Sequence, residues 1–274
     1  MSILVTGARG GVARHLIGLL REAGQEVRTA SSSPGAAEVV CDLADPATFP
    51  AALKGVTAAF VYAEPTGAAA FANAAAEAGA EHLVLLSSAA VLDPRADDSP
   101  LAKSHLDAER ALLAGPVPAT LLRPGSFSSN ALAWSWPVKA GRPVSLPYPD
   151  SHNDPIHEAD VADVAFAVLT NPGAPGTPHT LTGPASVTFA EQIDILAAVT
   201  GTPIAVEQVS RERWKEEMAD YIAGPHADAL LDWWEANVDR PAPITGTVER
   251  LTGHPARDFT TWAREHADAF RPSA

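Results

Sequence analysis

The fold is decided near the start of the chain, in the stretch Ile3-Leu4-Val5-Thr6-Gly7-Ala8-Arg9-Gly10-Gly11-Val12-Ala13-Arg14. Three apolar residues, typical of a buried strand, lead directly into a glycine-rich turn. After the turn, apolar residues recur at helical spacing as far as Leu20. A strand, a glycine turn and a helix in this order predict the first unit of an α/β fold.

The spacing Gly7-x-x-Gly10-x-x-Ala13 gives each small residue a separate task. Gly7 lets the chain turn sharply, Gly10 lets a phosphate approach the backbone, and Ala13 lets the helix lie close to the sheet. The backbone N–H groups at the start of such a helix bind a dinucleotide pyrophosphate. We therefore expect Gly7, Gly10, Gly11 and Val12 to bind a cofactor. An ordinary tight turn between strand and helix is the alternative.

Size and composition indicate a globular protein. The 274 residues are 46% hydrophobic and 19% charged, and the formal net charge of −14 disfavours nucleic acid as a partner. No apolar run approaches the roughly 20 residues that cross a bilayer. The lone cysteine, Cys41, fits a reducing compartment. We expect a cytoplasmic protein, monomeric or homodimeric, that binds neither nucleic acid nor membrane.

Strand and helix patterns alternate through the first half of the chain. Further strands are expected at 26–30, 39–43, 58–63, 82–88 and 119–123, with helices at 71–78 and 101–114 and a helix capped by Asp45-Pro46. This alternation predicts a Rossmann-type, doubly wound parallel sheet. Residues 1–125, with a returning segment at about 154–182, would form the cofactor domain. Residues 126–153 and 183–274 would form a smaller, mainly helical substrate cap.

The second half carries its own helix signals. Thr188 and Glu191 form a capping box that opens a helix ended by Gly201. A short strand is expected at 203–209, helical structure at 211–237, and a last helix at 260–270.

The end of the second expected strand predicts which cofactor is bound. An NAD site usually places a carboxylate there for the ribose 2′-hydroxyl. This chain has Ser31 and Ser32 instead, and Arg9 in the glycine turn, with Arg28 also near, could join them in holding a 2′-phosphate. We therefore expect NADP (NADPH) rather than NAD. A plain serine-rich loop is the alternative.

Other residues at the ends of expected strands suit the rest of the cofactor, because ligands bind at that edge of an open α/β sheet. Asp42 and Leu43 are placed for the adenine, and Tyr62 and Ala63 for the ribose. Ser87 and Ser88 end the fifth strand; capping of the following turn is the alternative role for both.

Residues 125–153 are irregular and rich in aromatic side chains, which suggests the wall of a pocket. The candidate substrate-binding residues are Phe127, Asn130, Trp134, Tyr148 and His152, with Trp136 as a further candidate. A surface excursion is the alternative.

Taken together, the motifs resemble the atypical and extended short-chain dehydrogenase/reductase superfamily, in its NmrA-like and quinone-oxidoreductase-like branch. The resemblance covers nearly the whole chain. It is carried by Thr6-Gly7-x-x-Gly10-x-x-Ala13, Asp42-Leu43-x-Asp45, Leu85-Leu86-Ser87-Ser88, His105-x-x-x-Glu109, Leu122-Arg123-Pro124-Gly125-x-Phe127 and Ile156-His157-x-x-Asp160. The resemblance implies a Rossmann fold and a nicotinamide cofactor, with Pro124 and Phe127 in the cofactor site.

The resemblance also exposes a departure at the expected catalytic residues. Enzymes of this superfamily typically use a serine together with a Tyr-x-x-x-Lys pair. Ser88 matches the serine, but the lysine position falls on His105 and the tyrosine position on Leu101. We assign Ser88 and His105 to catalysis. His105 can position the cofactor or act as a general acid, and an idle surface residue is the alternative.

Metal chemistry and hydrolysis are disfavoured. The segment with His152, Asp154, His157, Glu158 and Asp160 lacks the His-x-x-x-His spacing of metal sites, so we expect no metal. We also find no Gly-x-Ser-x-Gly motif. The favoured function is an NADP(H)-dependent reductase of a small quinone-like or conjugated carbonyl substrate. A cofactor-sensing regulatory protein of NmrA type and a non-redox isomerase or cyclase are the alternatives.

Overall fold

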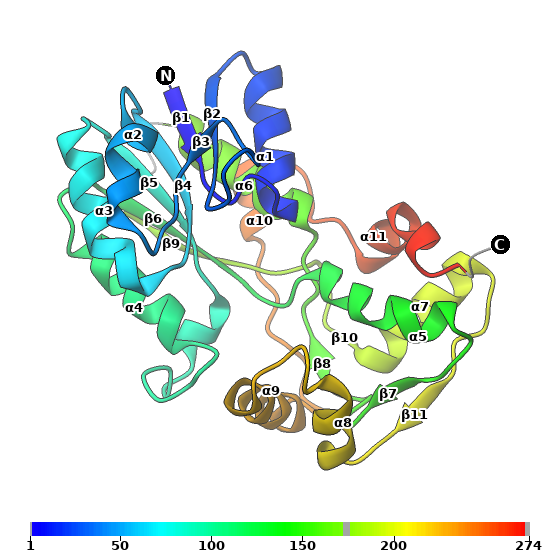
Figure 1. Cartoon of the computed structure of the whole chain (residues 1–274). Helices are drawn as coiled ribbons and strands as arrows, with labels where there is room; N and C mark the ends of the chain where they lie inside the picture. The colour runs from blue at the N-terminus through cyan, green and yellow to red at the C-terminus, as the bar shows by residue number, and fades with distance from the viewer. Residues whose placement is uncertain (1, 172–175, 272–274) are drawn as a thin grey trace. The chain divides into compact units, whose positions relative to one another are not determined.

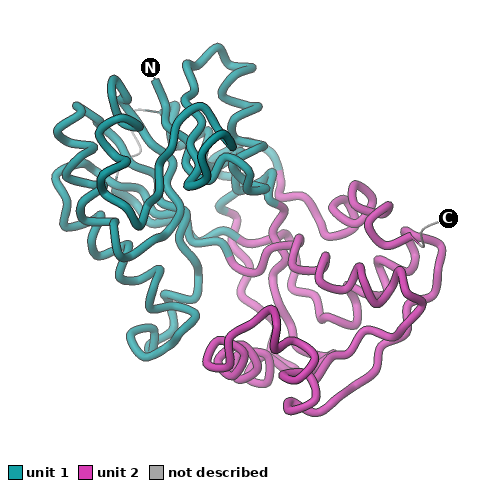
Figure 2. Tube along the Cα trace, viewed as in Figure 1, with its two compact units in different colours: residues 1–124, 158–181, 247–254 teal, residues 125–157, 182–246, 255–274 magenta. Residues whose placement is uncertain are grey.

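The computed structural model describes residues 2–171 and 176–271. Within it the chain divides into two compact units, coloured separately in Figure 2. Unit 1 contains residues 1–124, 158–181 and 247–254, and unit 2 contains residues 125–157, 182–246 and 255–274. Each unit is formed by segments that are distant in the sequence.

A parallel sheet of seven strands forms the centre of unit 1 (Figure 1). In spatial order the strands are β3 (Val39–Val40), β2 (Glu26–Ser31), β1 (Ser2–Val5), β4 (Ala58–Tyr62), β5 (His82–Leu86), β6 (Ala119–Pro124) and β9 (Pro178–Leu181). Every neighbouring pair is parallel. The order of β1, β2 and β3 runs in the opposite direction to that of β4, β5 and β6, which confirms the predicted Rossmann-type fold.

Helices cover both faces of this sheet because its strands are apolar on both faces. In β1, Leu4 joins the core beneath α2, α3 and α4, while Ile3 and Val5 point to the opposite face. On that opposite face α1 packs closely on α6. The helices of unit 1 are α1 (Gly11–Glu22), α2 (Phe49–Leu53), α3 (Pro65–Glu77), α4 (Lys103–Leu113), α6 (Glu158–Thr170) and α10 (Thr247–Thr252), with 3₁₀ turns at Pro46–Thr48 and Ala89–Leu92.

Several predicted boundaries in unit 1 were wrong. The helix expected at 71–78 begins at Pro65, after the Glu64 cap, and the strand expected at 82–88 ends at Leu86. The strand expected at 39–43 ends at Val40, because the Asp42 carboxylate accepts from the Ala44 N–H and the Asp42 carbonyl accepts from the Asp45 N–H, which together turn the chain. The helix expected from residue 101 begins at Lys103, so Leu101 lies outside it. The turn that precedes α4 is closed by the Ser99 carbonyl.

Unit 2 combines short strands with helices. Its elements are a 3₁₀ helix at Ser128–Trp134, α5 (Ser135–Lys139), β7 (Val144–Leu146), β8 (His152–Asn153), β10 (Val187–Thr188), α7 (Phe189–Thr200), β11 (Val206–Gln208), α8 (Arg211–Met218), α9 (Gly224–Ala236), α11 (Phe259–Glu265) and a 3₁₀ turn at Ala267–Ala269. The predicted capping box of Thr188 and Glu191 opens α7, and Gly201 ends it in the left-handed conformation. The helical region expected at 211–237 is interrupted, because Gly224-Pro225 begins a second helix.

Aromatic side chains supply much of the core of unit 2. The rings of Trp134, Phe189, Trp234 and Trp214 form a chain of edge-to-face contacts, with successive centroids 5.9, 5.1 and 5.0 Å apart.

The last helix is shorter than the predicted range 260–270, because α11 ends at Glu265 and a 3₁₀ turn follows. Trp262, wholly buried, stacks on His266 at that end.

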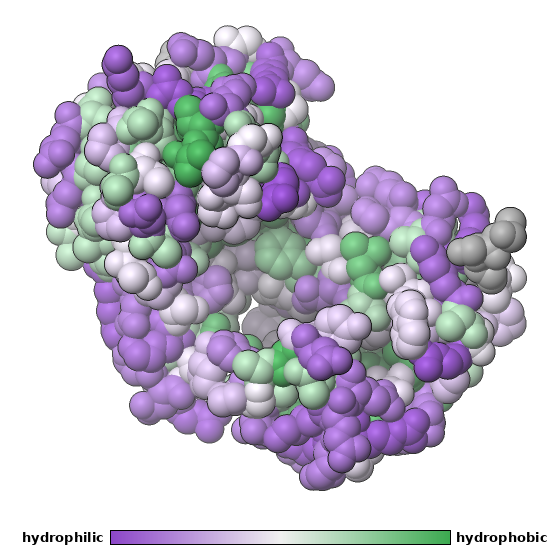
Figure 3. Space-filling view, viewed as in Figure 1, coloured by the Kyte–Doolittle hydropathy of each residue, from purple (hydrophilic) through white to green (hydrophobic). Residues whose placement is uncertain are grey.

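Hydrophilic residues prevail on the face of the protein that Figure 3 shows. Large apolar side chains that remain exposed include Trp136 and Tyr221. No helix within residues 2–171 and 176–271 is long and apolar enough to cross a membrane.

Close backbone packing beside β3 generates a stability prediction. A Cβ on Gly67 in α3 would overlap the carbonyl oxygen of Leu43. We expect Gly67→Ala to lower the free energy of unfolding by about 1–3 kcal/mol in urea titrations, as overpacking does. Gly18→Ala in α1 is the matched control, because a Cβ there meets nothing within 4 Å. The free energy of unfolding of the control should rise by up to about 1 kcal/mol, because alanine has a higher helix propensity than glycine. Equal effects at the two sites would contradict the packing account.

Candidate functional site

The glycine turn between β1 and α1 is shaped by backbone hydrogen bonds. Gly7 adopts a φ of +58°, and its carbonyl accepts from the Gly10 N–H at 2.8 Å. The Ala8 N–H donates to the Ala30 carbonyl of β2, which ties the turn to the neighbouring strand. Only glycine adopts the Gly7 conformation without strain. The predicted turn therefore lies at the carboxyl end of β1, where ligands of such sheets bind.

The start of α1 has no capping side chain of its own. Its N-cap, Gly10, provides no capping side chain, and no acidic residue occupies the first turn. The first intrahelical bond runs from the Arg14 N–H to the Gly10 carbonyl, so the N–H groups of Gly11, Val12 and Ala13 point out of the helix end. Such donors, at the positive end of the helix dipole, favour an anionic ligand.

Small residues in α1 allow it to approach the rest of unit 1. Ala13 is fully buried, and a Cβ on Gly11 would come within 3.3 Å of the Glu158 side chain of α6. A side chain at Gly11 would therefore press on Glu158, at the contact between α1 and α6.

The residues predicted to hold a 2′-phosphate do not all face the same way. Arg9 and Ser32 are exposed, whereas Ser31 is buried and its hydroxyl accepts from the Ser33 N–H at 3.2 Å. Arg28 was wrongly expected near this site, because its guanidinium donates to the carbonyls of Ala52 and Lys54.

Sequence reasoning missed a pocket beside this loop. It is lined by Ala8, Arg14, Ile17, Gly18, Arg21, Thr29 and Ala36. Arg21, one of its two cations, pairs with Glu38 at 3.3 Å. The signal in the sequence is the spacing of Arg14 and Arg21, which places both on one side of α1.

The residues predicted beside the adenine and ribose lie at the ends of β3 and β4. Asp42 and Leu43 follow β3 and are half-buried, and the Asp42 carboxylate already accepts from the Ala44 N–H. Tyr62 ends β4, its backbone N–H donates to the Thr6 hydroxyl, and Ala63 follows it.

The two serines after β5 have different partners. The buried Ser87 hydroxyl donates to the Glu109 carboxylate at 2.6 Å. The half-buried Ser88 hydroxyl accepts from the Ala90 N–H and caps the following 3₁₀ turn. Ser88 therefore performs the capping role considered for it, while its hydroxyl proton remains able to donate to a ligand.

Glu109 is the centre of a buried network that sequence reasoning did not recognise. Its carboxylate accepts from Arg123 of β6 in a bidentate pair, with Nε–Oε1 and Nη2–Oε2 distances of 2.9 and 2.6 Å. Glu109 is 2% exposed. The network joins α4, the end of β5 and the end of β6. A carboxylate on the apolar side of a helix, beside Ala108 and Leu112, was the available signal.

His105 lies one helical turn before Glu109. The imidazole is half-buried, and its Nδ1 is buried with no hydrogen-bond partner among the described residues. Burial lowers the pKa of His105 below its usual value, although the Glu109 charge opposes the shift. His105 is therefore neutral at pH 7. An unsatisfied buried nitrogen is costly, and a ligand hydroxyl would satisfy it.

The candidate substrate residues belong to unit 2 and have partners within it. The Asn130 amide lies 3.4 Å from the Ser126 hydroxyl, and His152 Nδ1 lies 3.3 Å from the Ser186 hydroxyl. The Tyr148 hydroxyl accepts from Arg211, and Trp134 packs on Phe189. Phe127 follows Pro124, the buried last residue of β6, by three positions, and its backbone bridges to Ile156.

Asp154 is a second buried carboxyl that the sequence reasoning left without a role. It accepts from the Ser126 N–H at 3.0 Å, and a Cβ on Gly125 would overlap its carboxyl group. Burial raises the pKa of Asp154 to about 6, against the opposing effect of backbone hydrogen bonds. The carboxyl therefore fixes the turn that follows β6.

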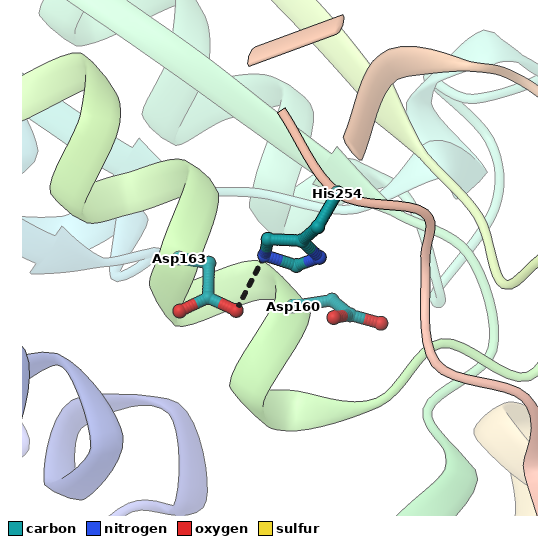
Figure 4. Close-up of side chains that lie close together, drawn as sticks. All are labelled: Asp160, Asp163 and His254. Atoms are coloured by element: carbon teal, nitrogen blue, oxygen red, sulfur yellow. Dashed lines mark ion pairs between the residues drawn. The ribbon is translucent and has the colours of Figure 1, made fainter. Parts of the chain in front are cut away.

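Three potential metal ligands come together in unit 1. Asp160 and Asp163 of α6 face His254, which follows α10 (Figure 4). One ligand atom from each lies within 4.8 Å of the others, and His254 Nε2 lies 3.2 Å from the Asp163 carboxylate. Of the five residues considered above for a metal, Asp160 alone belongs to this group. The ion pair accounts for the approach of His254 to Asp163.

A family model described as NAD(P)H-binding matches residues 7–172. A (4-alkanoyl-5-oxo-2,5-dihydrofuran-3-yl)methyl phosphate reductase from Streptomyces griseus is 36% identical over 282 residues, which cover 98% of this chain and 99% of that protein. An NAD(P)H azoreductase from Xenophilus azovorans is 29% identical over 286 residues, covering 98% and 99%.

Solved structures share the fold. The Citrobacter sp. triphenylmethane reductase complexed with NADP(H) has a TM-score of 0.78 at 21% identity, covering 97% of this chain and 100% of that one. The Escherichia coli NADPH-dependent quinone oxidoreductase complexed with NADPH has a TM-score of 0.79 at 22% identity, covering 96% and 99%.

The Glu109 network generates a prediction about stability. Arg123→Met leaves a buried carboxylate without its cation, and we expect the free energy of unfolding to fall by about 3–5 kcal/mol. Arg110→Met, on the same helix, is the matched control because both Arg110 and its partner Asp97 are more than half exposed. That pair should contribute at most about 1 kcal/mol. Denaturation curves that shift equally for the two variants would show that the buried network contributes no more to stability than the exposed ion pair.

The buried Asp154 generates a prediction about pH. Its folded-state pKa is raised from 3.8 to about 6, so the native state binds more protons than the unfolded state between these values. Stability is therefore lost as pH rises from about 4 to about 6. Asp154→Asn keeps the acceptor for Ser126 and removes the titration. It should be more stable than the unmodified protein at pH 7.5 by up to about 3 kcal/mol, and much less so at pH 4.5.

The control for this measurement is Asp150→Asn, which changes an exposed carboxyl in the preceding turn. A stability difference for Asp154→Asn that stays constant from pH 4.5 to pH 7.5 would count against the raised pKa.

Proposed function

We propose that this chain, which belongs to the NAD(P)H-binding family, is an NADP(H)-dependent oxidoreductase. Its substrate would be a small conjugated carbonyl or quinone-like compound. One observation carries the proposal: nearly the whole chain is 36% identical to a reductase. The name of that relative describes a ring double bond with two carbonyl groups attached to one of its carbons. A double bond of this kind accepts hydride readily, so a conjugated carbonyl is the substrate class that we favour.

The residues of unit 1 fit a dinucleotide on structural grounds. The uncapped start of α1 and the close approach allowed by Gly7 and Gly10 suit a pyrophosphate over Gly10 to Val12. The orphaned Nδ1 of His105 suits a ribose hydroxyl. We assign the remaining cofactor contacts to Arg9, Ser31, Ser32, Asp42, Leu43, the Tyr62 ring, Ala63, Ser87 and Pro124. When bound, the nicotinamide supplies the hydride.

The chain's own residues position the reactants and exclude water. Ser88 can donate its hydroxyl proton to a substrate carbonyl, and His105 holds the ribose. Leu101 stands where the superfamily has its tyrosine acid and has no proton to give. Reduction of a conjugated double bond leaves a carbanion-like product that solvent can protonate, so alignment matters more than a strong acid.

We further propose that unit 2 supplies the substrate contacts, through Phe127, Asn130, Trp134, Tyr148 and His152. The proposal thus keeps the predicted division of the chain into a cofactor domain and a substrate cap. Because the two full-length relatives from Streptomyces griseus and Xenophilus azovorans are named as reductases, the enzyme is favoured over a regulatory sensor or an isomerase. A cytoplasmic location agrees with Cys41, whose pKa burial raises to about 12, which keeps the thiol protonated and unreactive.

The activity test is consumption of NADPH with a panel of quinones, enones and acylated butenolides. We expect turnover with at least one conjugated acceptor. His105→Ala should weaken NADPH affinity by about 2- to 12-fold, the effect of one lost hydrogen bond, while turnover at saturating NADPH changes less. His226→Ala, which removes an exposed histidine of α9, is the control.

Two results would decide against parts of this account. A fall in turnover of on the order of 10²-fold in His105→Ala would make the histidine a general acid instead of a positioning group. Tight NADPH binding without oxidation by any acceptor would favour the regulatory sensor.

A further inference from the structure

Tyr62 lies directly over the glycine turn of unit 1. A Cβ on Gly7 would come 2.7 Å from the Tyr62 ring, and a Cβ on Gly10 would overlap the Tyr62 hydroxyl oxygen. The ring also makes an edge-to-face contact with Phe60, with centroids 5.7 Å apart. The absence of side chains at Gly7 and Gly10 thus creates space that the phenol fills.

The hydroxyl of Tyr62 reaches the start of α1. There the Ala13 backbone and the charge of Arg14 both act to lower the pKa of the phenol, because its oxygen lies close to them. Since Gly10 provides no capping side chain, the phenol oxygen over Gly10 occupies the place where an acceptor for this helix end would lie. Burial raises the pKa of Tyr62 above its usual value, so the group stays neutral at physiological pH.

We propose that the Tyr62 hydroxyl competes with the cofactor pyrophosphate for the N-terminus of α1, so that Tyr62 determines how tightly the dinucleotide binds. The inference rests on the proposed NADP(H) site. A phosphate over Gly10 to Val12 needs the same N–H groups and the same space above Gly10 that the phenol uses. The hydroxyl therefore leaves the helix end when the dinucleotide binds, and the free energy of moving it is subtracted from the binding free energy.

Affinity measurements test this competition directly. Tyr62→Phe keeps the ring and removes the competing acceptor, so NADPH should bind about 2- to 12-fold more tightly by titration calorimetry. NADH should tighten by the same factor, because both dinucleotides carry the pyrophosphate. Tyr221→Phe is the control, since Tyr221 is 80% exposed and its hydroxyl should not affect binding.

A spectroscopic readout follows the phenol itself. The chain has three tyrosines, so labelling with 3-fluorotyrosine gives three ¹⁹F signals, and Tyr62→Phe and Tyr221→Phe assign two of them. Saturating NADPH should move the Tyr62 signal and leave the Tyr221 signal in place. Neither experiment uses an electron acceptor, so absence of reductase activity would leave this test intact.

The opposite results overturn the proposal. Unchanged or weaker affinity for both dinucleotides in Tyr62→Phe would show that the hydroxyl does not compete, and weaker affinity would make it a cofactor ligand. A Tyr62 ¹⁹F signal that saturating NADPH does not move would show that the phenol keeps its place on the helix end.

Discussion

The rest of the structure depends on the small residues of the turn between β1 and α1, which let the chain turn sharply and let α1 pack closely on its neighbours. Gly7 turns the chain at a φ of +58°, and the fully buried Ala13 seats α1 on the sheet. Gly11 leaves room for the Glu158 side chain, so α6 can pack against α1. The same absence of side chains leaves space above the helix start, which the Tyr62 phenol fills and which a ligand of the N–H groups would need. One constraint therefore supports both the packing of unit 1 and its binding chemistry.

A second constraint fixes the opposite half of the sheet. The buried Glu109 carboxylate binds Arg123 through two hydrogen bonds and Ser87 through one, which ties α4 to the ends of β5 and β6. His105 extends from the same helix one turn earlier. A charged network of this kind holds the helix in one register, and the orientation of His105 is held with it. The positions of Ser87 and His105 are thus linked by a residue that need not touch the cofactor.

The sequence predicted features that depend on local pattern. The strand–glycine–helix start, the capping box of Thr188 and the parallel sheet all follow from periodicity and turn chemistry, and the structure contains them. Features that depend on partners distant in the sequence were harder to predict. The direction of Arg28 follows from carbonyl groups at the end of α2. The early end of β3 has a local cause, the turn hydrogen bonds of Asp42, which the apolar pattern of residues 39–43 does not reveal. The role of Glu109 requires knowing that Arg123 and Ser87 meet it. A charged residue on an apolar helix face is the sequence signal for such a network. The roles of the individual site residues remain predictions.

The central claim is that hydride passes from the nicotinamide to a conjugated carbonyl substrate. Its most direct test uses NADPH carrying deuterium at C4 of the nicotinamide, prepared separately with the label on each face, together with an enone or acylated butenolide in whose presence NADPH is consumed. The account predicts that one of the two labelled cofactors delivers deuterium to a carbon of the reduced product and that the other does not. Oxidation of NADPH with no deuterium in the product from either cofactor would contradict it.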